Sequence, residues 1–399
     1  MKKSLFGYGK TIKAIAKSGG WDIYDDKFND ISSDEYGNYL LPPSKFNPNE
    51  SELEITTPGF LPNKNIIKSA KNLISEYDYF KDTKPIKVWI SGTNGKTTTT
   101  QMIQHLMSKF GSVMGGNVGD PLGNLDKNAK FWVLETSSFT IHYTKFAYPK
   151  VYALLPVTPD HLSWHGNFEE YEKIKLKPLL MMDKNCTAII SAKYKNIKTK
   201  ANVIYYDNEQ DLAKFCDVNL EDINFRVPFL LDGLMALSIQ KLLINEVDVE
   251  LLNTFKLDKN RIEEFKDGLN RIWVNDTKAT NLDATIQAVR RYKDKKVHLI
   301  LGGDDKGVCL KPLFESFKNI DLIIYAIGSN TEKIVKLSKE FEIKFYRCEF
   351  LKIAVEEISN NLKIGEIALL SPACASLDQF SSYEERGNDF KKYVRNINI

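Results

Sequence analysis

Short apolar segments alternate along the chain with longer segments in which apolar residues recur at helical spacing. The short segments predict strands at residues 4–6, 21–24, 53–57, 87–91, 131–134, 151–155, 187–190, 271–274, 297–301, 322–327 and 367–370. Strands that alternate with helices in this way are typical of parallel sheets. The pattern therefore predicts an α/β protein.

The length of the chain and its polar segments indicate several domains. A chain of 399 residues is too long for one ordinary core. Residues 27–50 are polar and rich in Pro and Asn, which predicts irregular structure, and residues 81–85 have the composition of a linker. We predict domains at 1–83, 84–255 and 256–399.

Composition bears on the class of partner and on the compartment. The chain carries 55 Lys and Arg against 52 Asp and Glu, a net charge of +3. So small an excess gives no argument for a nucleic-acid or membrane partner. No apolar run reaches the ~18 residues of a membrane span. The five cysteines are scattered without metal-ligand spacing, which favours a reducing cytoplasm.

The segment after the predicted strand at 87–91 has the order of a phosphate-binding P-loop. It reads Gly92-Thr93-Asn94-Gly95-Lys96-Thr97-Thr98 and opens into a helix. In such a loop backbone N–H groups approach phosphate oxygens, the lysine reaches the β- and γ-phosphates, and the next hydroxyl binds Mg²⁺. The strict pattern has Gly at the position of Ile90, so a chance Gly-Lys-Thr turn is the alternative. The flanking strand and helix favour ATP and Mg²⁺.

Residues at two other strand ends could complete such a site. Glu135 directly follows the predicted strand at 131–134, where a carboxylate can hold Mg²⁺. His161 follows the next strand and could bind a metal or a substrate oxygen. The alternatives are an exposed strand-end glutamate and a loop histidine that caps the helix beginning near residue 168.

The predicted third domain has polar loops after three of its strands. These loops are residues 275–281, 302–306 and 371–376. Because the carboxyl ends of parallel strands meet at one edge of a sheet, the loops together predict one binding rim. Ordinary helix caps would explain any one of them alone.

A set of motifs in this chain resembles those of the Mur ligases. They are Gly92-Thr93-Asn94-Gly95-Lys96-Thr97-Thr98, Gly115-Gly116-Asn117, Leu134-Glu135-Thr136-Ser137-Ser138-Phe139, Asn275-Asp276-Thr277-Lys278-Ala279-Thr280-Asn281, Leu301-Gly302-Gly303, and Ser371-Pro372-Ala373-Cys374-Ala375-Ser376-Leu377-Asp378-Gln379-Phe380 with Tyr383-Glu384-Glu385-Arg386-Gly387. The resemblance spans residues from about 4 to 394, and its last motif is specific to the members that add D-glutamate.

The resemblance implies a three-domain α/β architecture and an ATP-driven amide ligation. The expected domains are a short Rossmann-like N-terminal domain, a central P-loop domain with a parallel sheet, and a C-terminal Rossmann-like domain. The implied substrates are UDP-N-acetylmuramoyl-L-alanine and D-glutamate, and the implied form is a cytoplasmic monomer with no nucleic-acid or membrane partner.

The resemblance also assigns roles around ATP. Lys96 and Thr97 would hold the β- and γ-phosphates and Mg²⁺, with two metal sites expected. Glu135 and His161 would ligate Mg²⁺. Lys175 matches the family lysine that CO₂ carbamylates, and the carbamate would supply a second acidic metal ligand.

Further residues are expected beside the nucleotide base and the two other substrates. Asn275 and Asp276 would lie near the base and ribose of ATP, and Asn117 would contact the muramoyl group. The other expected contacts are Thr11 and Asp25 beside the uridine diphosphate, and Lys306, Ser376 and Tyr383 around D-glutamate.

The chain departs from the family pattern at three places. Ser163-Trp164 replaces the usual Asp-Arg, residues 228–233 replace the usual Gly-x-His-Asn helix start, and Asn260-Arg261 replaces His-Arg. Two alternatives therefore stay open. One is a sister amide ligase such as folylpolyglutamate synthase, against which the C-terminal motif speaks. The other is a nucleotide-binding module that keeps the fold without ligating.

Overall fold

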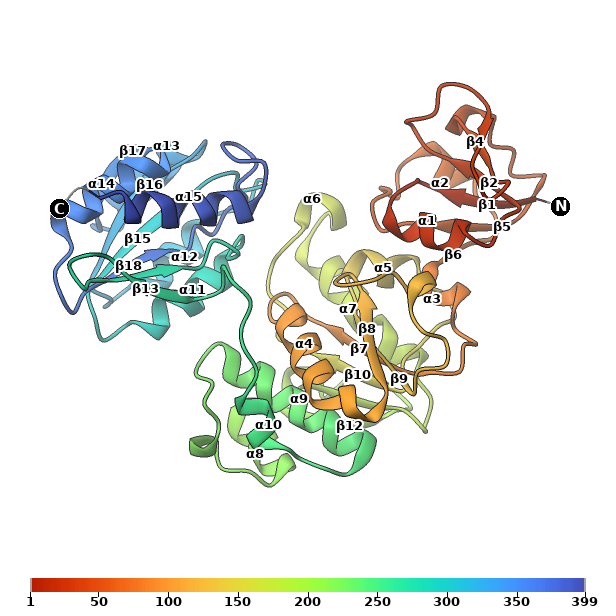
Figure 1. The fold of residues 1–399 in the computed structure, drawn as a ribbon, viewed down its shortest axis with the longest axis horizontal. Coiled ribbons are helices and arrows are strands. Elements are labelled where there is room, and N and C mark those ends of the chain that lie inside the picture. Colours follow the sequence, from red (N-terminus) through yellow and green to blue (C-terminus); the bar gives the residue numbers. More distant parts are fainter. Residues whose placement is uncertain (1, 398–399) are drawn as a thin grey trace. The chain divides into compact units, whose positions relative to one another are not determined.

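The computed structural model describes residues 2–397, which form three six-stranded sheets (Figure 1). The chain divides into two compact units. The first comprises the chain up to residue 159 with 164–225 and 229–255, and the second comprises 160–163, 226–228 and the chain from 256 onward. The first two sheets lie in the first unit and the third sheet lies in the second.

The first sheet has the strand order β3-β4-β2-β1-β5-β6. Its strands are β1 (Lys2–Phe6), β2 (Trp21–Tyr24), β3 (Ser32–Ser33), β4 (Tyr39–Leu41), β5 (Ser51–Thr56) and β6 (Leu73–Ser75), with helices α1 (Lys10–Ala16), α2 (Asn65–Ser69) and α3 (Glu76–Tyr79). The prediction that residues 27–50 are irregular was wrong in part. β4 forms there because it pairs in parallel with β2, a partner that the local composition does not indicate.

The second sheet is parallel throughout, in the order β12-β11-β10-β7-β9-β8. Its strands are β7 (Ile86–Ser91), β8 (Ser112–Gly116), β9 (Phe131–Glu135), β10 (Val151–Leu154), β11 (Thr187–Ser191) and β12 (Asn202–Tyr206). Its helices are α4 (Lys96–Met107), α5 (Ser138–Tyr143), α6 (Leu162–His165), α7 (Phe168–Met181), α8 (Glu209–Cys216), α9 (Phe229–Ile244) and α10 (Val249–Asn253). The edge strands β8 and β12 were not predicted.

The first two sheets share one hydrophobic core. Trp21 of the first sheet and Trp89 and Trp132 of the second belong to one cluster of buried residues. The Asp78 carboxylate also accepts hydrogen bonds from the backbone N–H groups of Phe146 and Ala147, both at 2.7 Å. These contacts explain why the two sheets form one compact unit.

The third sheet has the order β13-β14-β18-β15-β16-β17. Its strands are β13 (Glu263–Lys266), β14 (Ile272–Asn275), β15 (Val297–Gly302), β16 (Leu322–Ile327), β17 (Lys344–Glu349) and β18 (Ile367–Leu370), and its helices are α11 (Leu282–Arg291), α12 (Lys311–Ser316), α13 (Thr331–Glu340), α14 (Leu351–Asn361) and α15 (Tyr383–Arg395). The predicted strands are confirmed, whereas the two edge strands, the antiparallel β13 and the parallel β17, were not predicted.

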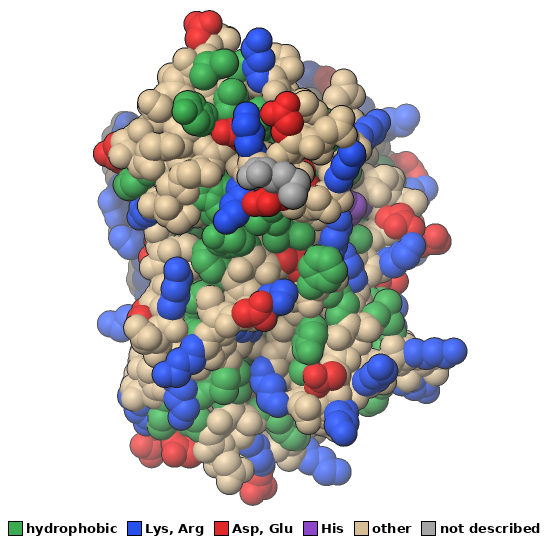
Figure 2. Space-filling view, turned by 90° about the vertical axis from the view of Figure 1, so that its right-hand side faces the viewer, with side chains coloured by type: hydrophobic (Ala, Val, Ile, Leu, Met, Phe, Trp, Pro, Cys, Tyr) green, Lys and Arg blue, Asp and Glu red, His purple; other side chains and the backbone are tan. Residues whose placement is uncertain are grey.

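Lys and Arg side chains are interspersed with Asp and Glu on the face that Figure 2 shows. That face therefore presents no large field of one sign. Among the described residues, no helix is long and apolar enough to cross a membrane.

Candidate functional site

The loop between β7 and α4 has the shape of a phosphate-binding turn. Gly95 is the N-cap of α4 at a φ of 81°, and no side chain caps the helix there. Gly92 has a φ of 141°, and a Cβ at this position would lie 2.6 Å from the Leu155 Cβ. The loop therefore needs glycine at both positions. The helix end without a side-chain cap leaves its first N–H groups for an anion.

Lys96 folds back over this loop. Its Nζ donates to the carbonyl oxygens of Gly92 at 3.1 Å and Thr93 at 2.7 Å. Lys175 on α7 reaches the same loop from the other side, since its Nζ donates to the Gly92 carbonyl at 2.8 Å. Only 1% of Lys175 is exposed, and its Nζ lies 4.9 Å from the centroid of the Tyr171 ring. Two lysines that are 79 positions apart in the sequence thus meet at one glycine.

Glu135 ends strand β9, which pairs directly with β7. Its Oε1 accepts from the Asn117 Nδ2 at 2.6 Å, while its buried Oε2 has no hydrogen-bond partner among residues 2–397. A buried carboxylate oxygen without a partner is costly in the unliganded protein. The alternative of an exposed strand-end glutamate is wrong, because Glu135 is only 2% exposed. The position fits an oxygen ligand for a cation.

His161 belongs to the second compact unit, whereas Glu135 belongs to the first. Its φ is 53°, its backbone N–H donates to the Asp160 Oδ1 at 2.8 Å, and its Nε2 lies 3.6 Å from the Asp160 Oδ2. The helix near residue 168 is capped by Asn167 instead, whose side chain accepts from the Glu170 N–H at 2.9 Å. The capping alternative for His161 is therefore wrong.

The residues expected to contact the UDP-linked substrate lie in the first unit. The Asp25 carboxylate accepts from the backbone N–H groups of Tyr8 at 2.6 Å and Lys27 at 2.9 Å, and so closes the turn after β1. Thr11 is half-buried in the first turn of α1. Asn117 follows β8, and its backbone N–H donates to the backbone carbonyl of Glu135 at 2.9 Å. Its side chain donates to the Glu135 carboxylate. The structure therefore joins Asn117 to the Glu135 carboxylate, a contact that the sequence did not indicate.

Asn275 and Asp276 are buried at the end of β14. The Asn275 Nδ2 donates to the Asn260 Oδ1 at 2.7 Å and to the Glu263 Oε2 at 3.1 Å. The Asp276 Oδ2 accepts from the Ser371 Oγ at 2.8 Å, and burial raises the pKa of Asp276 to about 7. Both side chains are thus held by other parts of the third sheet.

The three polar loops of the third sheet do meet at one edge. Asp304 and Ala375 exchange backbone hydrogen bonds at 3.0 and 2.9 Å, which joins the loop of Lys306 to the loop of Ser376. Lys306 is exposed with a φ of 51°, whereas Ser376 is only 3% exposed.

Arg386 ties two of these loops to helix α15. It is 1% exposed and donates to the Thr277 Oγ1 at 2.9 Å, to the Thr277 carbonyl at 2.9 Å and to the Cys374 carbonyl at 3.2 Å. The Thr277 Oγ1 in turn donates to the backbone carbonyl of Tyr383 at 3.1 Å. The motif containing Arg386 was noticed in the sequence, but this connecting role was not.

Several known proteins are similar to this chain along its whole length. A sequence profile of the Mur ligase middle domain matches residues 90–240. A UDP-N-acetylmuramoylalanine--D-glutamate ligase from Campylobacter jejuni is 56% identical over 402 residues, covering 100% of both chains. The chain belongs to this ligase family. The enzyme of the same name from Helicobacter pylori is 44% identical, covering 99% of each chain.

Solved Mur ligases share the fold at low identity. The MurF ligase from Thermotoga maritima in complex with ADP has a TM-score of 0.60 at 16% identity, covering 86% of this chain and 89% of that one. The UDP-N-acetylmuramate-alanine ligase MurC from the same organism has a TM-score of 0.58 at 17% identity, covering 98% of each. The three sheets therefore form the Mur ligase architecture.

Trp164 stands where the Mur ligase pattern usually has Arg. Its ring centroid lies 4.8 Å from that of Phe139 and 5.0 Å from that of His142, both on α5. The neighbouring His165 Nε2 lies 3.0 Å from the Ser138 Oγ at the start of the same helix. An aromatic cluster therefore joins α6 to α5 in this member of the D-glutamate ligases.

Asp232 is a residue near the phosphate loop that the sequence analysis did not single out. It accepts from the Thr99 Oγ1 at 2.8 Å and is only 5% exposed. A Cβ placed on Gly95 would lie 2.3 Å from the Asp232 Oδ1, so the carboxylate packs directly on the loop. One signal was available: Asp232 is the only acidic residue in the apolar helix α9.

Proposed function

We propose that this protein joins D-glutamate to UDP-N-acetylmuramoyl-L-alanine in an ATP-dependent step of peptidoglycan precursor synthesis. The observation that carries the proposal is full-length identity of 56% and 44% to D-glutamate ligases, combined with a phosphate loop beside a buried carboxylate. In the proposed reaction the alanine carboxylate takes the γ-phosphoryl group of ATP. The amine of D-glutamate then displaces phosphate from that acyl phosphate and forms the amide.

The phosphate loop accounts for the nucleotide half of this reaction. Residues 92–98 present backbone N–H groups and the helix end to the phosphates, and Lys96 is close enough to exchange its loop carbonyls for phosphate oxygens. Catalysis of this kind consists mostly of positioning and charge neutralisation.

Mg²⁺, when bound, would neutralise the charge of the transferring phosphoryl group. Thr97 and Glu135 would hold it, with His161 and a carbamylated Lys175 as further ligands, in two metal sites. No group of three or more His, Cys, Asp and Glu that could hold a metal occurs among residues 2–397. A carbamate on Lys175 would add the missing acidic oxygen, and the unpartnered Oε2 of Glu135 supports the assignment.

The third sheet accounts for the amino-acid half. We place D-glutamate at the rim of Lys306, Ser376 and Tyr383, where a cation and a hydroxyl can bind a carboxylate. Asn275 and Asp276, assigned to the base and ribose, are held by protein partners and would act through the loop that follows them. Thr11, Asp25 and Asn117 remain proposed contacts of the UDP-linked substrate.

The proposal includes a cytoplasmic monomer with domains at 1–83, 84–255 and 256–399. Each of the three sheets falls within one of these ranges. All five cysteines are free thiols, which supports a reducing compartment.

The test is phosphate release from ATP with UDP-N-acetylmuramoyl-L-alanine present and D-glutamate added or withheld. We expect release that requires both partners and is not supported by L-glutamate. Nucleotide binding without release would favour the non-catalytic module. Release only with a folate-type acceptor would favour the sister ligase.

A further inference from the structure

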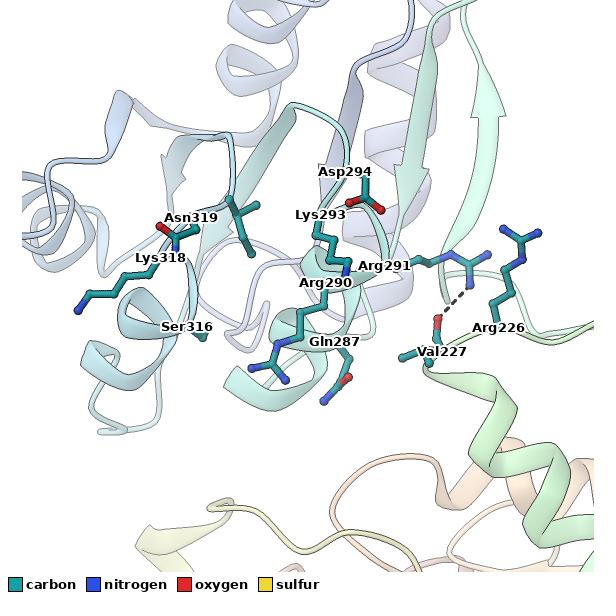
Figure 3. A pocket seen from close by; sticks show the side chains of 11 residues that line it. Arg226, Val227, Gln287, Arg290, Arg291, Lys293, Asp294, Ser316, Lys318 and Asn319 are labelled. Atoms are coloured by element: carbon teal, nitrogen blue, oxygen red, sulfur yellow. Dashed lines mark hydrogen bonds between the residues drawn. The ribbon is translucent and has the colours of Figure 1, made fainter. Parts of the chain in front are cut away.

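The second compact unit contains a cavity of about 790 Å³ at the opposite edge of the sheet from the polar rim. Its lining comes from the end of α11 and from the loops that enter the amino-terminal ends of β15 and β16 (Figure 3). Two residues of the 226–228 segment, which belongs to the same unit, complete it. None of these residues takes part in the proposed reaction.

Positive charge dominates the lining of this cavity. Five cations face a single carboxylate, Asp294, an excess of four against a net charge of +3 for the whole chain. The cations are Arg226, Arg290, Arg291, Lys293 and Lys318. Like charges gathered in one concavity repel one another, so the arrangement is stabilised when an anion enters.

Most of these cations lack a protein partner. Among residues 2–397, no ion pair or side-chain hydrogen bond holds Arg226, Arg290, Lys293 or Lys318. Arg291 is the one that is fixed, since its Nη1 donates to the Val227 carbonyl at 3.0 Å (Figure 3). Other exposed cations of the third sheet do pair, for example Lys311 with Glu340 and Lys333 with Asp305, both at 2.8 Å.

Helix electrostatics explain only part of the cluster. Arg290 and Arg291 lie in the last turn of α11, where cations offset the negative end of the helix dipole. Lys293 and Lys318 lie in loops outside that helix, and Lys318 comes from the segment before β16. The dipole therefore does not account for the lining cations that come from segments outside the helix.

We propose that this cavity is a binding site for a diphosphate anion, inorganic or carried by a nucleotide. Guanidinium groups pair with phosphate oxygens through two parallel hydrogen bonds, and lysines add point charges. Gln287 and Asn319 line the same cavity, and their amide groups can donate to the remaining oxygens. The excess of four positive charges in the lining favours a ligand with two linked phosphates over a single phosphate.

The test is calorimetric titration of the full chain with inorganic pyrophosphate and, separately, with ADP. Every protein carries Lys96→Ala, so that binding at the phosphate loop is weakened equally. The cavity variant adds Arg290→Gln and Lys318→Gln. The matched control adds Lys336→Gln and Lys363→Gln, two exposed lysines of the same unit outside the cavity, so that both proteins have the same net charge.

We expect the control to bind about one equivalent of pyrophosphate and the cavity variant to bind it at least about ten-fold more weakly, because two charge-assisted contacts are lost. A larger difference with ADP than with pyrophosphate would identify a nucleotide as the source of the diphosphate. Equal affinity in the two proteins, or no binding in either, would overturn the proposal. The cavity variant with Lys96 restored should ligate as fast as wild type. Failure of the cavity proposal can therefore be distinguished from failure of the proposed function.

Discussion

The carboxyl ends of the second and third sheets present polar residues in two different ways. At the second sheet the Glu135 Oε2 and the Thr98 Oγ1 are buried without a hydrogen-bond partner in the part of the chain that the structure describes. At the third sheet the buried side chains of Asn275, Asp276 and Arg386 are all bonded to other parts of the protein. Unpartnered buried oxygens are tolerated where a ligand completes the site, whereas partnered ones stiffen the fold.

The difference separates two kinds of sensitivity. Changes around the phosphate loop should reduce activity and leave folding intact, because the buried oxygens there that lack a partner among the described residues, such as the Glu135 Oε2, are proposed to be completed by a ligand. Changes among the buried residues in the polar rim of the third sheet should reduce the stability of the fold before they reduce activity. Its exposed residues, such as Lys306, are the ones proposed to contact substrate.

The largest expected effect comes from Lys96→Ala. Ligation should fall on the order of 10³-fold or more, because the lost charge acts mainly on the transferring phosphoryl group. The measurement is D-glutamate-dependent phosphate release, with the thermal midpoint of unfolding as a check on folding. Lys109→Ala, an exposed lysine just after α4, is the control and should be active. Near-normal turnover of Lys96→Ala would remove the phosphate-loop assignment.

Lys175→Ala should reduce ligation by roughly 10²- to 10³-fold, since an anionic ligand would be lost from the proposed metal site. Added short carboxylates should restore part of the activity, because they can place an oxygen where the carbamate was. Lys173→Ala changes an exposed lysine on the same helix and should have no effect. An enzyme indifferent to CO₂ depletion and bicarbonate would argue against the carbamate.

Arg386→Met tests how much the buried hydrogen bonds in the polar rim of the third sheet contribute to stability. We expect a loss of about 3 kcal/mol in the free energy of unfolding of the second unit, because the carbonyls of Thr277 and Cys374 would be left buried without a donor. Hydrogen exchange in β14 and β18 measures this loss. Arg395→Met, at the exposed end of the same helix, is the control. Unchanged hydrogen-exchange protection in Arg386→Met would show that the loops keep their structure without the hydrogen bonds of Arg386.

Ser376→Ala sharpens the assignment of D-glutamate to the third sheet. The apparent KM for D-glutamate should rise a few-fold to tens of fold, since one hydrogen bond to a charged group contributes roughly 1.5–3 kcal/mol. The KM for ATP should change little, and steady-state kinetics with each substrate varied in turn measures both. A rise in the KM for ATP alone would assign this rim to the nucleotide.

The last expected effect is a dependence of stability on pH that arises from Asp276. Burial raises its pKa from 3.8 to about 7, so the folded protein holds a proton that the unfolded chain has released. This contribution to stability is therefore lost as pH rises from about 4 to about 7. Relative to wild type, Asp276→Asn should gain about 4 kcal/mol in the free energy of unfolding across that window, since each unit of pKa corresponds to about 1.4 kcal/mol. Denaturant unfolding at several pH values measures this effect. A difference in the free energy of unfolding between the two proteins that does not change with pH would contradict the prediction.

Much of the fold could be predicted because its central strands are short apolar runs, and such a run can be identified from its own few residues. The strands predicted at 322–327 and 367–370 agree with β16 and β18. The strands missed were at or near sheet edges, such as β12 and β17, where only part of each strand is buried and the apolar pattern is weak. Their pairing depends on a neighbouring strand, so composition alone does not reveal them.

The sequence by itself determined the phosphate loop, because glycine, lysine and hydroxyl positions act within seven consecutive residues between a strand and a helix. Only the tertiary structure decided which distant groups meet there. The contact of Thr99 with Asp232 joins residues 133 positions apart, and that of Arg386 with Thr277 spans 109. Contacts of this range depend on how helices pack on sheets, and no local spacing encodes them.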